Sequence, residues 1–248
     1  MFDRRRFILA ALAVAAQEKG HAAKFTPDDA SADLDQLGAF ERALGRPGFV
    51  IGLPHGAPDS GTLEAGRILC ARLGVGGVFV TGFWDAKTRH RINVNRNTEV
   101  QIGAHSEVLR EWPSPRAVAA TERYVALVKE AAQGKLEVFY EIHSNHRPQY
   151  ADSIQVSTLG ISRGEAQRMK EAFNAACEHL DATVPRPTMH VSPLDRVSYP
   201  NYVRASAVAA FSVKGCAIEH PGRVFDRRPW RVAYAAVLAD AISETKWL

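Results

Sequence analysis

The sequence predicts an α/β protein with a mixed, largely parallel central sheet and helices on both faces. Short apolar runs, several of them bounded by Gly or Pro, are typical of buried strands, as at Phe49–Leu53, Gly77–Thr81 and Glu137–Ile142. Amphipathic stretches of helical length lie between these runs, and this alternation indicates βαβ units. Shorter strands that follow one another without a helix predict that the sheet is mixed rather than wholly parallel.

The remaining elements follow from the same two periodicities. The predicted helices are 62–73, 115–132, 163–180 and 230–242, with a short one at 34–44, and the further strands are 91–95, 154–158 and 214–219. Ser162, with Glu165 three residues later, predicts a capping box at the start of the third long helix. Gly74 predicts the end of the first.

Composition excludes several classes of protein. With 248 residues, 46% of them hydrophobic and 23% charged, the chain has the balance of a globular protein, not of a disordered one. Its net charge of +4 is modest and its arginines are spread along the chain, so we expect no nucleic-acid partner. Cys70, Cys177 and Cys216 are an odd number without paired spacing, which predicts buried thiols and no disulfide framework.

The first residues have the pattern of an export signal. A basic stretch, Arg4–Arg6, precedes the apolar run Leu9–Ala16, which is too short for a stable membrane span. Arg4 and Arg5 followed by Phe7 and Ile8 look like a twin-arginine signal, although Asp3 departs from the usual Ser or Thr. An ordinary amphipathic N-terminal helix is the alternative.

These features give an expected organisation. Residues 1–16 are a twin-arginine-type signal peptide, residues 17–47 an N-terminal tether, and residues 48–248 a single catalytic α/β domain. The twin-arginine export machinery is then a partner, and the protein is expected in the periplasm.

Four short polar motifs stand at or beside the ends of apolar runs. They are Pro54–Asp59, Asn93–Arg96, Glu141–His146 and Ala217–His220. Strand ends are where an α/β sheet gathers distant residues into one crevice. We therefore expect side chains from these motifs to form one site.

Three of these residues suit a zinc ion. A catalytic zinc site has three protein ligands and an open position for water, whose pKa falls to roughly 7. His55, Asp59 and His143 offer two imidazoles and a carboxylate, and Glu64 is the alternative carboxylate. Taken singly, a histidine at a strand end is often a core residue bonded to the backbone, and Asp59 would also serve as a helix N-cap.

Other residues of the motifs suit proton transfer and substrate binding. Glu219 ends an apolar strand, so it is either a general base or the ion-pair partner of Arg223. The forked guanidinium of Arg96 suits a substrate carboxylate. Asn95, His146 and Arg223 complete the predicted substrate site.

The remaining candidates have weaker patterns. Tyr199 and Tyr202 could supply a phenol to a developing oxyanion. His220 follows Glu219, so strand alternation directs it to the opposite face. Polar contexts predict surface positions for three further histidines, His90, His105 and His190.

In their order along the chain, the motifs resemble those of N-formylglutamate amidohydrolases. The resemblance rests on Pro54-His55-Gly56, Asn95-Arg96, Glu141–Ser144 and Ala217–Glu219, and it runs from about Phe49 to Arg223. That family is grouped with the aspartoacylases and zinc carboxypeptidases, which share one α/β fold.

The resemblance implies a role for each matching residue. His55, Asp59 and His143 look like the ligands of one Zn²⁺ per chain, Arg96 like the substrate-carboxylate clamp, and Glu219 like the general base. A zinc-dependent hydrolase of amide bonds in N-acyl amino acids is then expected.

Two departures from the family pattern leave alternatives open. Zinc carboxypeptidases have His-x-x-Glu where this chain has His-x-x-x-Asp, so the middle ligand is Asp59 or Glu64. Asn93 and Val94 replace the usual Asp-Leu, which leaves the substrate open. A periplasmic zinc peptidase acting on short peptides or cell-wall fragments, and a non-catalytic carboxylate-binding domain, are the rival hypotheses.

Overall fold

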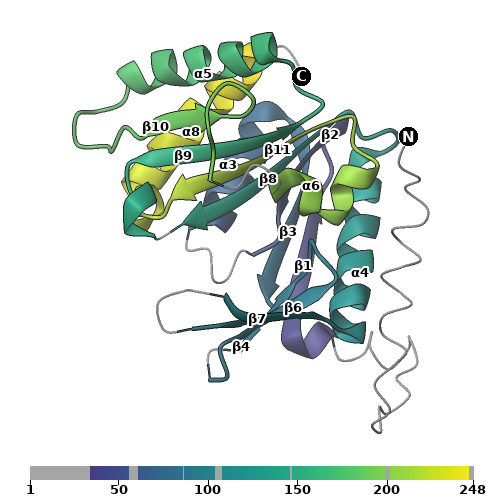
Figure 1. Cartoon of the computed structure of the whole chain (residues 1–248). Helices are drawn as coiled ribbons and strands as arrows, with labels where there is room; N and C mark the ends of the chain where they lie inside the picture. Colours follow the sequence, from purple (N-terminus) through teal and green to yellow (C-terminus); the bar gives the residue numbers. More distant parts are fainter. Residues whose placement is uncertain are drawn as a thin grey trace, which may run out of the picture.

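The computed structural model describes residues 34–55, 61–85, 87–103, 108–145, 147–198 and 202–245. Its larger sheet comprises β1 (Gly38–Ala43), β2 (Arg46–Leu53), β3 (Val75–Gly82), β8 (Val138–Asn145), β9 (Ser153–Leu159), β10 (Thr188–Val191) and β11 (Lys214–Pro221). These seven strands lie in the order β1-β3-β2-β8-β11-β9-β10 (Figure 1).

The centre of this sheet is parallel and its flanks are mixed. Strands β3, β2, β8 and β11 run parallel to one another. Strand β1 is antiparallel to β3, and β9 is antiparallel to β11, with β10 parallel to β9. The predicted mixed, largely parallel sheet is confirmed.

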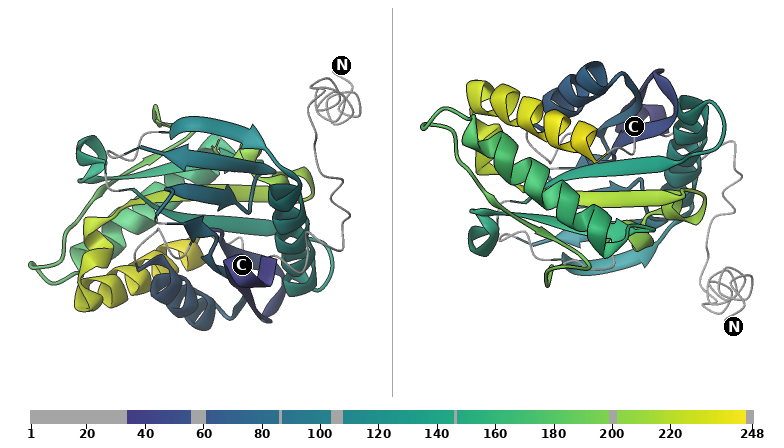
Figure 2. Two further views of the ribbon diagram at one scale, coloured as in Figure 1. Left: turned by 90° about the horizontal axis from the view of Figure 1, so that it is seen from below. Right: turned by 90° about the horizontal axis from the view of Figure 1, so that it is seen from above.

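Helices cover both faces of the sheet. On one face, α3 (Thr62–Leu73), α5 (Arg163–Glu178) and α8 (Arg228–Glu244) share a core with the strands. The other face carries α4 (Pro115–Ala132) (Figure 2). The shorter helical segments are η2 (Pro148–Tyr150), α6 (Tyr202–Ala205), η3 (Ala207–Ala210) and α7 (Arg223–Asp226).

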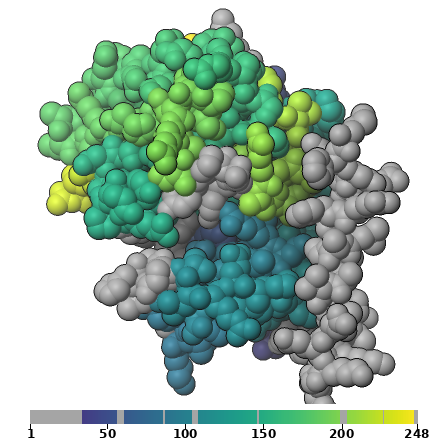
Figure 3. Space-filling view, in the orientation of Figure 1, coloured from purple at the N-terminus to yellow at the C-terminus, as the bar shows by residue number. Residues whose placement is uncertain are grey.

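A second, antiparallel sheet has four strands in sequence order. They are β4 (Trp84–Asp85), β5 (His90–Asn93), β6 (Thr98–Ile102) and β7 (Val108–Pro113). Ile92 and Val100 are buried, and Ile92 joins the core of α4. In the view of Figure 3, the blue-to-teal atoms of this sheet lie below the green atoms of the β9–β10 region.

Strand alternation in β8 explains why polar residues can be buried in the central sheet. Tyr140 and Ile142 point into the core of α3, α5 and α8, whereas Phe139 points into the core of α4. Glu141 and His143 continue the face of Phe139, because side chains two residues apart share a face. The α4 face of the sheet thus changes from apolar to polar toward the carboxyl end of β8.

The predicted long helices are present within two residues of their expected bounds. The Ser162–Glu165 capping box is also confirmed, and α3 ends at Gly74 with positive φ. All three cysteines are free and buried, as expected. Burial raises the pKa of the Cys70 thiol to about 12, so this thiol stays protonated at neutral pH.

The prediction of a short helix at 34–44 is wrong for residues 38–43. Gly38–Ala43 forms β1, which pairs along its whole length with β3. Phe40 alternates onto the face where it contacts Phe83, with ring centroids 5.1 Å apart. The large sheet therefore begins inside the segment 17–47 that we expected to be a tether. The strand predicted at 91–95 ends at Asn93, and β1, β4, β6, β7 and β10 were not predicted.

The predicted signal peptide, residues 1–16, lies outside the described residues. Within the part of the chain that the structure describes, no helix combines the length and apolar character needed to cross a membrane.

The capping box makes a prediction about stability. Lys214 and Ser162 hydrogen-bond the Glu165 carboxylate and lower its pKa to about 2. A carboxyl whose folded-state pKa lies below its unfolded value of about 4.3 stabilises the fold above that value, and the contribution is lost as the pH falls. Glu165→Gln should cost about 1 kcal/mol of unfolding free energy at pH 7, and less toward pH 3.

Urea unfolding across this pH range measures the difference. Glu171→Gln is the matched control, because the Glu171 carboxylate accepts an exposed hydrogen bond from Gln167 on the same helix. A constant deficit for Glu165→Gln from pH 7 to pH 3 would contradict the ionic origin of the effect.

Candidate active site

Two buried histidines meet where two parallel strands end. Gly52 of β2 lies opposite Glu141 of β8, and His55 and His143 follow these residues by three and two positions. The imidazole centroids are 5.2 Å apart with an interplanar angle of 52°. His55 is 5% exposed and His143 is 2% exposed, so the pair is shielded from bulk water.

A row of polar residues extends from His143 across the neighbouring strands. Glu219 of β11 lies in register with His143, Gln155 of β9 with Glu219, and His190 of β10 with Gln155. Residues in register share one face of a sheet, with adjacent strands about 4.8 Å apart. A buried carboxylate thus stands one strand away from the imidazole pair.

The turn between β5 and β6 brings Asn95 and Arg96 to the same place. Val94 is fully buried in the core of α4, which anchors the turn. The Asn95 side-chain amide donates to Oε1 of Glu141 at 2.7 Å. The turn of the second sheet is thereby attached to the large sheet two residues from His143.

Glu141 is a fully buried carboxylate with three hydrogen-bonding partners. Besides Asn95, its Oε1 lies 2.9 Å from Nε2 of His143, and its Oε2 accepts from the Ser206 hydroxyl at 2.7 Å. Burial raises the pKa of Glu141, but the bonds and charge of His143 and the bonds from Ser206 and Asn95 outweigh burial, so the pKa lies below its ordinary value. The carboxylate is therefore ionised at neutral pH.

The electrostatic environment keeps His55 neutral. Burial lowers its pKa well below the ordinary value, and the positive charges of Arg91, His143 and Arg96 lower it further. A neutral imidazole is the form that binds a metal ion. Sequence reasoning missed Arg91. Its side chain shares a strand face with Asn93, to which it donates at 3.1 Å, and this alternation was the available signal.

The described part of the site fits a metal ion but does not complete its ligand set. Among residues 34–55, 61–85, 87–103, 108–145, 147–198 and 202–245, no three His, Cys, Asp or Glu side chains gather in a metal-binding cluster. Nδ1 of His55 is buried and has no hydrogen-bond partner among them. Two adjacent imidazoles, one with such a nitrogen, are a donor set suited to zinc.

The other predicted site residues fall into two groups. Asp59, His146 and Tyr199 lie outside the described residues, as does the side chain of Tyr202. Glu64 does not join the histidines, because its carboxylate binds Arg228 and Arg231 of α8.

Arg223 and His220 are both described. The Arg223 guanidinium binds Asp152, beyond the end of β8. His220 points away from the site, as alternation predicted, and its Nδ1 lies 2.8 Å from the Tyr234 hydroxyl.

A polar cavity of about 390 Å³ adjoins the row of strand-end residues. Gln155, which lies in register with Glu219, is part of its wall. His190, expected on the surface, is half-buried and lines the same cavity with Arg196 and Ser198. The cavity therefore provides space for a polar group beside Gln155, one strand away from Glu219.

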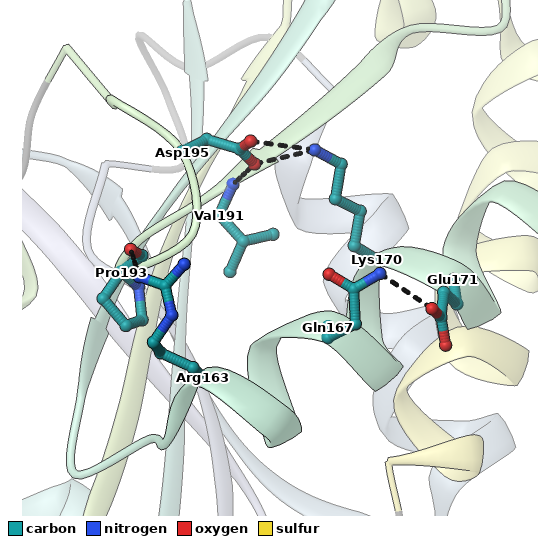
Figure 4. Close-up of polar contacts among 7 residues, drawn as sticks. All are labelled: Arg163, Gln167, Lys170, Glu171, Val191, Pro193 and Asp195. Atoms are coloured by element: carbon teal, nitrogen blue, oxygen red, sulfur yellow. Dashed lines mark hydrogen bonds and ion pairs between the residues drawn. The ribbon is translucent and has the colours of Figure 1, made fainter.

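Helix α5 holds the segment that carries Arg196 and Ser198 into the cavity wall. The Lys170 ammonium binds both carboxylate oxygens of Asp195, at 3.0 and 2.8 Å, and Asp195 accepts the Val191 backbone N–H at 2.9 Å (Figure 4). Arg163 donates to the Pro193 carbonyl at 2.9 Å. This wall of the cavity is thus fixed by contacts on its outer side.

Comparison with known proteins gives similarity of fold. No family model matches the chain, and no curated protein has a significantly similar sequence. A bacteriophage poly-gamma-glutamate hydrolase is 13% identical, with a TM-score of 0.49, over 93% of this chain and 95% of that chain.

Two further solved structures resemble the chain. A metallo-carboxypeptidase from Burkholderia cenocepacia is 12% identical, with a TM-score of 0.43, over 98% of this chain and 69% of that chain. An N-acetylmuramoyl-L-alanine amidase of Nostoc punctiforme is 15% identical, with a TM-score of 0.39, over 81% of this chain and 97% of that chain.

The outer contacts of the cavity wall can be tested with Lys170→Met. This variant keeps most of the unbranched side chain but leaves Asp195 without its ammonium partner. We expect faster hydrogen exchange at residues 192–198 and a loss of about 1 kcal/mol in unfolding free energy. Gln167→Ala, on the exposed surface of the same helix, is the control and should leave exchange in this segment unchanged. Equal exchange in both variants would refute the anchoring role of Lys170.

Proposed function

We propose that this protein is a zinc-dependent hydrolase of amide bonds. The observation that carries the proposal is the buried pair of His55 and His143, with Glu219 in register one strand away. This arrangement combines two buried imidazoles with a carboxylate one strand away from His143. A domain that only binds ligands with a carboxylate group would need the arginines, but it would not need Glu219 beside the histidines.

His55 and His143 would hold the zinc ion together with Asp59. Nδ1 of His55 is the nitrogen without a partner among the described residues, and Nε2 of His143 contacts Oε1 of Glu141. Bound zinc supplies a Lewis acid that polarises a carbonyl and lowers the pKa of water to roughly 7. Asp59 is preferred to Glu64 because two arginines hold the Glu64 carboxylate.

Glu219 acts as the general base of the proposed reaction. Its carboxylate takes the proton of the attacking water and then passes it to the leaving nitrogen, a role that requires a carboxylate beside the metal ligands but outside their set. Its position in register with His143 supports this assignment.

Arginines near His55 bind the substrate carboxylate. Both Arg91 and Arg96 are close enough to lower the pKa of His55 by their charge. Arg96 follows Asn95, whose amide is anchored to Glu141, so its backbone position is well defined. A guanidinium binds a carboxylate through two parallel hydrogen bonds.

Two substrate classes fit this site. The resemblance to N-formylglutamate amidohydrolases favours an N-acyl amino acid. The cavity of about 390 Å³ that Gln155 lines, one strand away from Glu219, favours a short peptide, because it offers space for a further residue of a longer chain. The basic and apolar N-terminal stretch further supports twin-arginine export to the periplasm, where peptides and cell-wall fragments occur. Release of free amino acids from peptides, without hydrolysis of N-formyl or N-acetyl amino acids, would select the peptidase.

Metal content and turnover together test the roles of Glu219 and His143. We expect about one zinc per wild-type chain by elemental analysis, and loss of this zinc in His143→Ala. Glu219→Gln should keep its zinc and lose about 10²- to 10⁴-fold in kcat, because only proton transfer is removed. Loss of zinc from Glu219→Gln would indicate that Glu219 is a zinc ligand and not the general base. Absence of zinc from the wild type, even after zinc addition, would leave the carboxylate-binding domain as the better hypothesis.

The carboxylate clamp makes a separate kinetic prediction. Arg96→Gln should raise KM about 10-fold or more with little change in kcat, since a lost charged hydrogen bond costs about 1.5–3 kcal/mol. Arg91→Gln is measured in parallel, because the structure places both cations near His55. Arg110→Gln is the control, since the Arg110 guanidinium stacks on Trp112 of the second sheet. An unchanged KM in both site variants would show that the substrate carboxylate binds elsewhere.

A further inference from the structure

Glu141 has the surroundings of a functional residue but no part in the proposed chemistry. Its side chain is 0% exposed, so it reaches neither water nor substrate. A carboxylate buried in this way costs several kcal/mol unless hydrogen bonds and charge compensate. The compensating donors come from three separate parts of the chain, namely Asn95, His143 and Ser206.

The contact with His143 determines which ring nitrogen carries the proton. A carboxylate only accepts hydrogen bonds, so Nε2 of His143, 2.9 Å from Oε1 of Glu141, is the protonated nitrogen. In a neutral imidazole the lone pair is then on Nδ1. Histidines that bind metals commonly donate their other N–H to a carboxylate, which fixes the ring orientation and raises its basicity.

The contact with Asn95 also links Glu141 to the turn that carries Arg96, the proposed clamp for the substrate carboxylate. Oε1 of Glu141 accepts from both His143 and Asn95, so one oxygen atom joins the two motifs. The Asn95 carbonyl accepts the Ala207 N–H at 2.9 Å, and the adjacent Ser206 binds the other carboxylate oxygen at 2.7 Å. The turn that ends in Arg96 is therefore held on both sides.

We propose that Glu141 is a positioning residue that holds His143 in its Nε2–H tautomer and fixes the Asn95–Arg96 turn, so that one buried carboxylate sets both metal affinity and substrate-carboxylate affinity. The expected effects on metal affinity and substrate affinity rest on the proposed function. The tautomer of His143 is measured independently of that function, because the contact with Glu141 does not involve metal or substrate.

Glu141→Gln is the variant that best distinguishes the positioning role of the Glu141 carboxylate from its contribution to packing. The amide oxygen of glutamine can replace Oε1 toward His143 and Asn95, and its NH₂ can donate to the Ser206 hydroxyl, so the shape of the network is preserved. The charge is lost, and hydrogen bonds to a neutral acceptor are roughly half as strong. We expect the zinc Kd of the metal-free protein, measured by competition with a chromogenic chelator, to rise about 10- to 100-fold. KM for the substrate should rise with it.

Two further variants make the result specific. Glu99→Gln is the matched control, because Glu99, in β6 of the second sheet, is also a buried carboxylate and binds Arg116 of α4. It should lower stability and leave the zinc Kd unchanged. Asn95→Ala removes only the link to the turn, so it should raise KM while the zinc Kd remains within about threefold of wild type.

Nitrogen-15 NMR of the zinc-free wild-type protein measures the tautomer without any substitution. The Nε2–H form of His143 is expected, and the Nδ1–H form would overturn the proposal. An unchanged zinc Kd in Glu141→Gln, or an equal rise in Glu99→Gln, would also overturn it. A protein that shows the expected tautomer but takes up no zinc would refute the proposed function while the orientation of His143 by Glu141 stands.

Discussion

The parallel pairing of β8 with β2 on one side and β11 on the other is the constraint on which the site depends. This register places His55 beside His143 and Glu219 opposite His143. A shift of one residue would turn every side chain of β8 to the other face and direct His143 into the core of α3, α5 and α8. The apolar side chains of β8 oppose such a shift, because Tyr140 and Ile142 would then leave that core. Packing on one face of the sheet thus specifies the chemistry on the other.

The elements that could be predicted from the sequence are those whose signals are local. The helices at 62–73 and 115–132 were predicted with their observed bounds, because Gly74 ends the first and Ser114 caps the second. Strand β1 was missed because Gly38–Ala43 is an edge strand, half exposed, whose conformation depends on pairing with β3. Of the second sheet only β5 was predicted. Strands β4, β6 and β7 were missed for a similar reason, since they are short and β7 is largely exposed.

The residues of the candidate site also differ in whether a local sequence signal identifies them. His55, His143 and Glu219 were recognised because each follows or ends an apolar run, which is a local signal. The partners of Glu141 could not be predicted, because Ser206 and Asn95 lie 65 and 46 residues away along the chain. Only the folded sheet shows that this carboxylate is a shared acceptor.

The second sheet has a consequence for how such a protein can diversify. Residues 84–113 lie between β3 and α4 and carry both arginines near His55, whereas His143 and Glu219 belong to the large sheet and His55 follows its strand β2. Loops and peripheral hairpins tolerate changes of sequence and length far better than central strands do. Under the proposed function, substrate preference can therefore evolve by exchange of this segment while the candidate hydrolytic centre is inherited unchanged, provided that the new turn still donates one hydrogen bond to the buried Glu141 of β8.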